Sequence, residues 1–194
     1  MREFRLFDSA LPIGSFNFSS TVEEAFLSGY DVKEYISSLY RNVVLRGDVV
    51  AVKVAFRDPF LADELVFASK LTREMKDSSV SMGRALADLG LCNTPFLEAV
   101  RGGETPGTYP AVVGEVCKCQ GIDLRTCMEG VAYSELSQMV YSAVKLGAMD
   151  FHEGQDLLSS LMEFREYEEF FPCNPVTEVL SVSHESREPK MFNS

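Results

Sequence analysis

The stretch from Leu71 to Leu91, LTREMKDSSVSMGRALADLGL, constrains the fold more than any other part of the chain. Its apolar residues return every three or four positions, a period that places them in one stripe along an α-helix. Thr72 offers a hydroxyl group for the N-cap, and Gly90 can take the left-handed conformation that ends a helix. Small residues such as Ser79 and Gly83 stand midway, where they allow a second helix to approach closely. The stretch therefore predicts a helix in the middle of a bundle.

Capping and turn signals divide the rest of the chain into further helices. The expected starts are Ser20-x-x-Glu23 with Thr21-x-x-Glu24, Asp31-x-x-Glu34, Asp58-Pro59, Pro110 and Asp123. The expected stops are Gly29, Gly47 and Gly121, while Gly130 is expected to divide or bend its helix, and Gly154 and Gln155 to precede a last amphipathic helix. The sequence predicts an all-α, single-domain bundle of roughly eight to ten helices.

Three segments lack a clear helical signal. Residues 1–19 are expected to be irregular, and residues 92–108, rich in glycine, are expected to form a loop. Residues 48–57 are ambiguous, because their valines favour a strand by propensity while both neighbouring segments are helical. We interpret this segment as helix.

Composition excludes several classes of function. The chain of 194 residues has a net charge of −11, whereas a nucleic-acid-binding surface needs a surplus of lysine and arginine. A basic protein partner fits this charge better. No apolar run reaches the length needed to span a bilayer, and the first residues, MREFRLFDS, show no signal-peptide core. These features predict a cytoplasmic protein that binds neither nucleic acid nor membranes.

The five cysteines form no CxxC pair and, being odd in number, do not indicate a disulfide framework. Cys117 and Cys119 could form a thiolate metal site. Residues two apart on a helix, however, point roughly 200° away from each other. Buried or half-buried free thiols are the preferred interpretation.

No catalytic motif is visible. The chain has no GxxxxGK[ST] phosphate loop and no GxGxxG. The pairs His152-Glu153 and His184-Glu185 could hold a metal transiently, but ligands adjacent in sequence chelate poorly, and solvated surface pairs are the simpler interpretation. Nothing in the pattern joins a nucleophile to a base. From the residues alone, the chain is an acidic helical domain.

Four stretches, taken in order, resemble the urease accessory protein UreF family. They are DSALPIGSFNFSSTVEEAFLSG from Asp8, TREMKDSSVSMGRAL from Thr72, VKLGAMDFHEGQDLL from Val144 and SHESREPKMFNS from Ser183. Each motif is weak by itself, but the four in order are fairly specific and extend over almost the whole chain. The chain departs from the family pattern at residues 18–23 and at residues 146–149.

The resemblance implies an all-helical, non-enzymatic, homodimeric chaperone for nickel insertion into urease. Such a protein would bridge UreD (also called UreH) and the GTPase UreG during maturation of the urease apoprotein. It would bind no cofactor stably, because nickel is handled by the complex. The resemblance also implies that Gln155 takes part in partner binding and that Lys145 faces UreG, although an ordinary helix-end lysine is an equal alternative.

The resemblance further implies that tail residues His184, Glu185, Met191 and Phe192 dock on UreD. Residues 172–194 mix apolar and polar side chains without a period, as in segments that are flexible or become ordered by a partner. The alternative is a tail that packs on its own bundle. Two other functions stay open: a small helical enzyme that uses a cysteine or a His-Glu site, and a helical adaptor for another basic protein.

Overall fold

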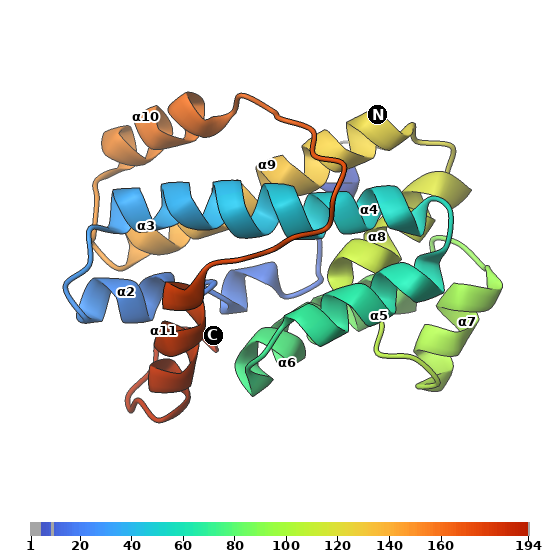
Figure 1. The fold of residues 1–194 in the computed structure, drawn as a ribbon, viewed down its shortest axis with the longest axis horizontal. Coiled ribbons are helices and arrows are strands. Elements are labelled where there is room, and N and C mark those ends of the chain that lie inside the picture. Colours follow the sequence, from blue (N-terminus) through green and yellow to red (C-terminus); the bar gives the residue numbers. More distant parts are fainter. Residues whose placement is uncertain (1–4, 9, 194) are drawn as a thin grey trace.

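The computed structural model describes residues 5–8 and 10–193, with only the backbone of Phe16, and these residues form an all-α structure (Figure 1). The predicted fold class is therefore confirmed. The irregular segment predicted at residues 1–19 lies partly outside the described residues. The elements are η1 (Ser15–Asn17), α2 (Val22–Leu27), α3 (Val32–Leu39), η2 (Tyr40–Asp48), α4 (Val49–Ala55), α5 (Pro59–Ser69), α6 (Arg73–Asp88), α7 (Pro95–Gly102), α8 (Tyr109–Cys119), α9 (Leu124–Lys145), α10 (Phe151–Leu161) and α11 (Pro175–Glu185).

The helix starts follow the predicted caps in most places. The side chain of Asp31 accepts hydrogen bonds from the backbone amides of Lys33 and Glu34, at 3.0 and 3.1 Å. Asp58, Thr72 and Asp123 likewise accept an amide at the start of α5, α6 and α9. These local signals fixed four helix starts correctly.

The sequence predicted that the helix beginning after Asp31 would end at Gly47, and this prediction is wrong. The helix α3 continues through η2, a π-helical segment, into α4, so that residues 32–55 form one rod through the middle of the molecule (Figure 1). Gly47 is required for another reason: a Cβ atom on it would lie 2.7 Å from the Cβ of Pro172. The glycine admits a later part of the chain and does not stop the helix. The interpretation of residues 48–57 as helix is confirmed for the seven residues of α4.

Gly130 likewise does not divide α9, which runs unbroken for 22 residues. A Cβ atom at Gly130 would lie within 2.4 Å of the Phe7 ring, so the glycine makes room for the N-terminal segment. The helix α10 begins at Phe151 and therefore includes Gly154 and Gln155, which were predicted to precede it, because Asp150 and Glu153 form a capping box.

The predicted loop at residues 92–108 contains the helix α7. Its start has an ordinary signal, Thr94 as the N-cap followed by Pro95, and the Thr94 hydroxyl accepts the Leu97 amide. The remaining loop is fixed by Asp63, a fully buried residue of α5. Its carboxylate accepts hydrogen bonds from the amides of Gly107 and Thr108 at 2.9 and 2.6 Å.

The core lies where α8 passes behind the central rod and contacts α4, α5, α6 and α9. Almost every residue of α8 is buried, from Tyr109 to Cys117. Gly114 allows this approach, since a Cβ atom there would lie 2.8 Å from the Cβ of Ala55 in α4. None of the helices in the described residues is long and apolar enough to cross a membrane.

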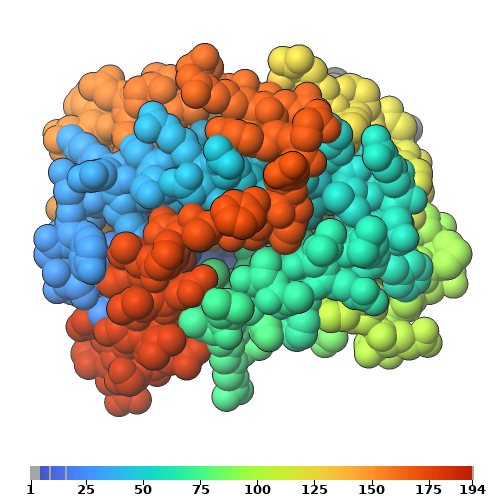
Figure 2. Space-filling view, viewed as in Figure 1, coloured from blue at the N-terminus to red at the C-terminus, as the bar shows by residue number. Residues whose placement is uncertain are grey.

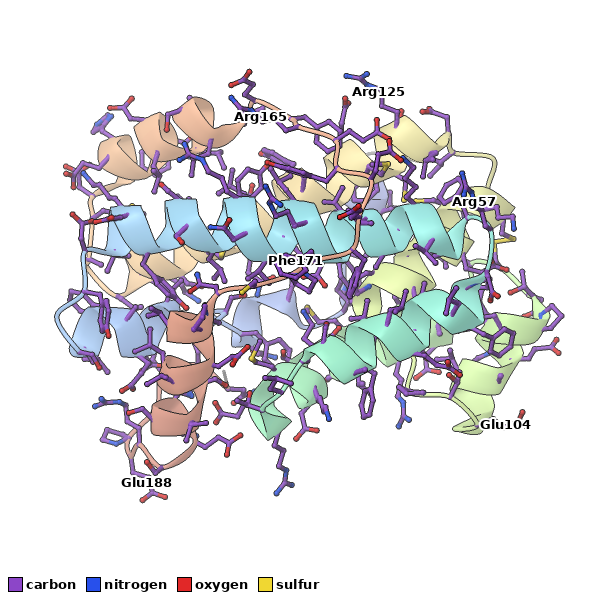
Figure 3. The ribbon with its side chains drawn as sticks, in the orientation of Figure 1. Arg57, Glu104, Arg125, Arg165, Phe171 and Glu188 are labelled. Atoms are coloured by element: carbon purple, nitrogen blue, oxygen red, sulfur yellow. A yellow bond between two sulfur atoms is a disulfide. The ribbon has the colours of Figure 1, made fainter. Side chains whose placement is uncertain are left out.

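After α10, an extended strap crosses the central rod and leads into α11 (Figures 1 and 2). Phe171 marks the crossing in Figure 3, and its amide donates to the carbonyl oxygen of Arg46 at 2.9 Å. The amide of Cys173 donates to the carbonyl oxygen of Asn42 at 3.1 Å. The structure thus differs from the expectation of an unpatterned tail: residues 172–193 include a helix and lie against their own bundle.

The interpretation of the cysteines as free thiols is wrong for two of them. Cys92 and Cys119 are joined by a disulfide, whereas Cys117 and Cys127 are buried free thiols and Cys173 is an exposed one. Cys117 is buried in the core and Cys119 is exposed, which agrees with the predicted opposite directions of residues two apart on a helix. Sequence spacing missed the pair because Cys92 and Cys119 stand 27 residues apart and meet only when α8 packs beside the end of α6.

Candidate partner-binding surface

Two adjacent glutamates on the short helix α2 are buried. The N-cap Thr21 has a φ of 65° and makes no side-chain cap, so neither predicted capping box forms. Glu23 and Glu24 are only 3% and 0% exposed. Because a buried carboxylate is costly unless it is paired, these side chains must find cations or donors elsewhere in the chain. They find them in the C-terminal tail.

His184 of α11 is fully buried between two carboxylates. Its Nδ1 lies 2.7 Å from Oε2 of Glu74 in α6, and its Nε2 lies 3.3 Å from Oε2 of Glu23. This imidazole therefore connects α2, α6 and α11 at one point. The sequence had predicted His184 as a partner-binding residue without indicating either carboxylate.

Glu24 is paired with Arg187, just beyond α11. The guanidinium Nη2 donates to Oε1 of Glu24 at 2.9 Å, and Nε donates to Oε2. The hydroxyl of Ser183 also donates to Oε1, at 2.7 Å. The hydrogen bond from Arg187, followed by the one from Ser183, outweighs burial and lowers the pKa of Glu24 from 4.5 to about 2.

The last residues complete this arrangement. The amides of Met191 and Phe192 donate to Oε1 and Oε2 of Glu23 at 2.8 and 2.9 Å, and Lys190 Nζ donates to Oε1 of Glu74 at 2.6 Å. We call this group the tail latch; it consists of Glu23, Glu24 and Glu74 with His184, Arg187, Lys190 and the amides of Met191 and Phe192. In Figure 3, Glu188 lies at the outer tip of the turn between α11 and the last residues.

Glu185, the fourth predicted tail residue, is a helix cap. Its Oε1 accepts the amides of Arg73 and Glu74 at 3.1 and 3.3 Å, at the positive end of α6. The side chain thus fixes α11 against α6. The interpretation of His184-Glu185 as a solvated surface pair is wrong for His184, which is fully buried and binds the carboxylates of Glu74 and Glu23.

Met191 and Phe192 have opposite exposures. Met191 is 63% exposed and Phe192 only 4%. Met191 is therefore available to a partner, whereas Phe192 anchors the tail on its own bundle. The helix α11 adds a row of exposed valines at a spacing of three residues, Val176, Val179 and Val182.

Lys145 lies beside the anchored tail. Its Nζ is 5.5 Å from the ring centroid of Phe192 and 5.5 Å from that of Tyr141, and the side chain is exposed. The structure thus brings together Lys145 and Phe192, which the resemblance assigned to different partners. Gln155 belongs to α10. It lines an open groove of about 460 Å³ together with the exposed rings of Tyr141 and Phe151.

A second charged cluster lies inside the bundle, beneath the strap. Lys70 Nζ is 3.1 Å from Oδ1 of Asp48, and Glu135 of α9 lines the same cavity. Burial, reinforced by the Asp48 carboxylate, raises the pKa of Glu135 well above its ordinary value. Burial opposes the charge on Lys70, but the two carboxylates raise its pKa. This cluster could not be predicted from local sequence patterns, because its members come from three separate elements.

The described residues contain no group of three or more histidine, cysteine and carboxylate side chains that could hold a metal ion. The pair His152-Glu153 is exposed, in agreement with its interpretation as a solvated surface pair. Glu153 caps α10 and binds Lys33 Nζ at 2.6 Å, and His152 lies edge-on to the Phe151 ring.

Four further residues of the site were not predicted from the sequence: Glu23, Glu24, Glu74 and Arg187. The only available signal was the adjacent glutamate pair, and it was interpreted as two helix caps. The role of these four residues in holding the tail depends on contacts between residues that are 110 to 169 positions apart in the sequence.

The described residues define an all-helical protein whose C-terminal tail is held on the bundle by buried charges. The UreF family model matches residues 28–162, which is more than half of the chain. Urease accessory protein UreF 1 of Brucella melitensis is 26% identical over 95% of this chain and 88% of its own length. Urease accessory protein UreF 2 of Brucella abortus shows the same identity and coverage. Urease accessory protein UreF of Yersinia pestis is 27% identical over 96% of this chain and 94% of its own length.

The chain belongs to the UreF family of urease accessory proteins. The resemblance found in the sequence is thereby confirmed. The family consists of accessory proteins and not of enzymes, in agreement with the prediction for this chain.

Proposed function

We propose that this chain is a scaffold for nickel insertion into urease, bridging UreD (UreH) and the GTPase UreG on the urease apoprotein. The observation that carries the proposal is the match to the UreF family together with relatives aligned over 95–96% of the chain. In this proposal the chain works in the cytoplasm as a homodimer. Nickel is cargo of the complex, and the chain itself keeps no cofactor.

We assign the surface that includes Met191 and the valines of α11 to UreD. Met191 and Val179 are 63% and 67% exposed, so they can be buried by a partner without unfolding the bundle. His184, Glu185 and Phe192 act by holding this surface in place, because each is bound to α2 or α6 or lies buried against the bundle. The tail latch is thus the support of the docking surface.

We assign Lys145 and Gln155 to UreG. Both side chains are exposed, and the groove beside Gln155 has aromatic walls formed by Tyr141 and Phe151. Lys145 lies over the Tyr141 ring at the edge of this groove. An ammonium group beside exposed aromatic rings offers a partner both an ion-pairing group and apolar area.

Size-exclusion chromatography with a purified UreD homologue tests the first assignment. We expect Met191→Asp and Val179→Asp to abolish co-elution while leaving the thermal midpoint nearly unchanged. Each removes an apolar side chain whose burial contributes about 1.5–3 kcal/mol and places a charge in the interface. Glu169→Ala, an exposed change on the strap, is the matched control. Full co-elution of both aspartate variants would reject this surface.

The second assignment is tested by Lys145→Ala in a urease activation assay with a host lacking its own UreF. We expect weaker recruitment of UreG and less active urease from a protein of unchanged stability. Normal activation would show that Lys145 is only a helix-end charge. If the wild-type chain binds neither UreD nor UreG, the alternative of a helical adaptor for another basic protein gains support.

A further inference from the structure

The disulfide between Cys92 and Cys119 lies at the end of the molecule opposite the tail. Cys92 follows α6, Cys119 is the last residue of α8, and the helix α7 lies in the segment that the bond closes. Figure 1 shows α7 at the far side of the bundle from α11. Of the other three cysteines, two are fully buried, so they are shielded from small thiols in solution.

We infer that Cys92 and Cys119 form a reversible thiol–disulfide site, opened by small thiols such as glutathione, that acts as a clasp on α7. Cys119 is exposed and Cys92 half-buried, so the sulfur of Cys119 is the one open to attack. The inference is independent of the proposed role in urease maturation.

The reaction is an ordinary pair of exchanges. A glutathione thiolate attacks Sγ of Cys119, forms a bond to it and releases Cys92 as a thiolate, which takes a proton from water. A second glutathione thiolate attacks the glutathione sulfur of this mixed disulfide and releases Cys119. The two glutathione molecules supply both electrons and leave as glutathione disulfide. Excess glutathione disulfide reverses both steps.

The structure keeps the two cysteines close without the covalent bond. Gln120 Nε2 donates to the carbonyl oxygen of Leu91 at 3.4 Å, which ties the end of α8 to the residue before Cys92. Arg101 of α7 donates to the carbonyl oxygens of Ala87 and Cys92, at 3.1 and 3.4 Å. The reduced thiols therefore stay within reach of each other and can be oxidised again.

The reduced state also has a place for the released thiol. Sγ of Cys92 lies 4.0 Å from the carbonyl oxygen of Val116, which can accept the thiol proton. Opening the bond thus leaves the half-buried Cys92 thiol beside a hydrogen-bond acceptor.

Glutathione redox buffers followed by native maleimide labelling of the full chain test the site. In a Cys173→Ser chain, which lacks the exposed free thiol, we expect no tag in the oxidised state and two in the reduced state, with Cys92 and Cys119 gaining tags together. A pair that stays closed in a large excess of reduced glutathione overturns the inference. A reduced pair that still takes both tags after treatment with excess glutathione disulfide also overturns the inference.

Two single variants test the site of attack. Both variants are incubated with glutathione disulfide. The Cys92→Ser variant keeps the exposed Cys119, which should form a glutathione adduct quickly. The Cys119→Ser variant keeps the half-buried Cys92, which should form this adduct slowly. The reverse order would overturn the assignment of Cys119. Cys173→Ser is the control and should leave the redox transition of the wild-type pair unchanged.

Hydrogen exchange of the wild-type chain tests the clasp. Reduction should speed amide exchange in residues 93–108 and leave residues 183–193 unchanged, because the tail latch lies at the other end of the bundle. Equal exchange of residues 93–108 in the two redox states would show that the bond does not restrain α7.

Discussion

Two helix contacts in this molecule have opposite chemistry: α8 lies against α4 through small apolar residues, whereas α11 lies against α2 and α6 through buried charges. The apolar contact gains free energy from buried area, and its strength does not depend on protonation. The charged contact is stable only when each buried carboxylate is paired with a cation or a hydrogen-bond donor, because a buried charge without a partner destabilises it. The first gives the bundle its stability, and the second sets the position of the tail.

The largest effect is expected from breaking the apolar contact. Gly114→Val would place its Cβ 2.8 Å from the Cβ of Ala55 and 3.3 Å from the carbonyl oxygen of Val52, so α8 would have to move away from α4. We expect a loss of about 3 kcal/mol in the free energy of unfolding, measured by urea denaturation. Gly102→Ala, where a Cβ makes only ordinary contacts, should change it little. Equal stability of both variants would contradict the close approach of α8.

The next largest effect is expected at the tail latch. Glu23→Ala removes the acceptor of the Met191 and Phe192 amides and one partner of His184. We expect a cost of about 1–3 kcal/mol, seen as faster hydrogen exchange in residues 184–193. Exchange in α8 should stay slow, and Glu169→Ala serves as the control. Uniform acceleration across the chain would show that the two contacts are not separate.

A smaller effect is expected from acid. Because the folded state holds the pKa of Glu24 at about 2, below its ordinary 4.5, the pairing with Arg187 stabilises the tail above pH 4.5. That stabilisation should be lost as the pH falls from 4.5 toward 2. The effect should be smaller than that of Glu23→Ala, because the partly exposed Arg187 is screened by solvent. Limited proteolysis of the tail across this pH range measures it, and Glu24→Gln should remove this part of the pH dependence.

The smallest effect is expected from Lys145→Ala. The ammonium is exposed, and it lies 5.5 Å from the ring centroids of Tyr141 and Phe192. The free energy of unfolding should therefore change by about 0.5 kcal/mol or less. Differential scanning calorimetry measures this change. A substantially larger loss would mean that Lys145 belongs to the tail latch and is not a free contact residue.

Much of the fold was predictable because its signals are local. Asp31, Asp58, Thr72 and Asp123 cap helices that the sequence had placed correctly, since a cap bonds amides two or three residues away. Glycines were less reliable. Gly90 and Gly121 take left-handed conformations at helix ends, whereas Gly47 and Gly130 lie inside helices and admit Pro172 and Phe7. Sequence alone cannot separate these two uses of glycine.

The candidate site was predictable only in part. The family resemblance led to Lys145, Gln155 and the four tail residues, but not to which of them are exposed. Met191 and Phe192 are adjacent in sequence and opposite in burial, a difference that only the docking of the tail on α2 produces.

By itself, the sequence determined an all-helical chain of the UreF type, because capping, helical period and motif order are carried by residues close together. The tertiary structure alone decided that Glu23 and Glu24 lie inside, that the strap crosses the central rod and that Cys92 meets Cys119. A helical pattern indicates which face of a segment is apolar, but it does not say which distant side chain will satisfy a buried charge. That choice is made when the helices pack.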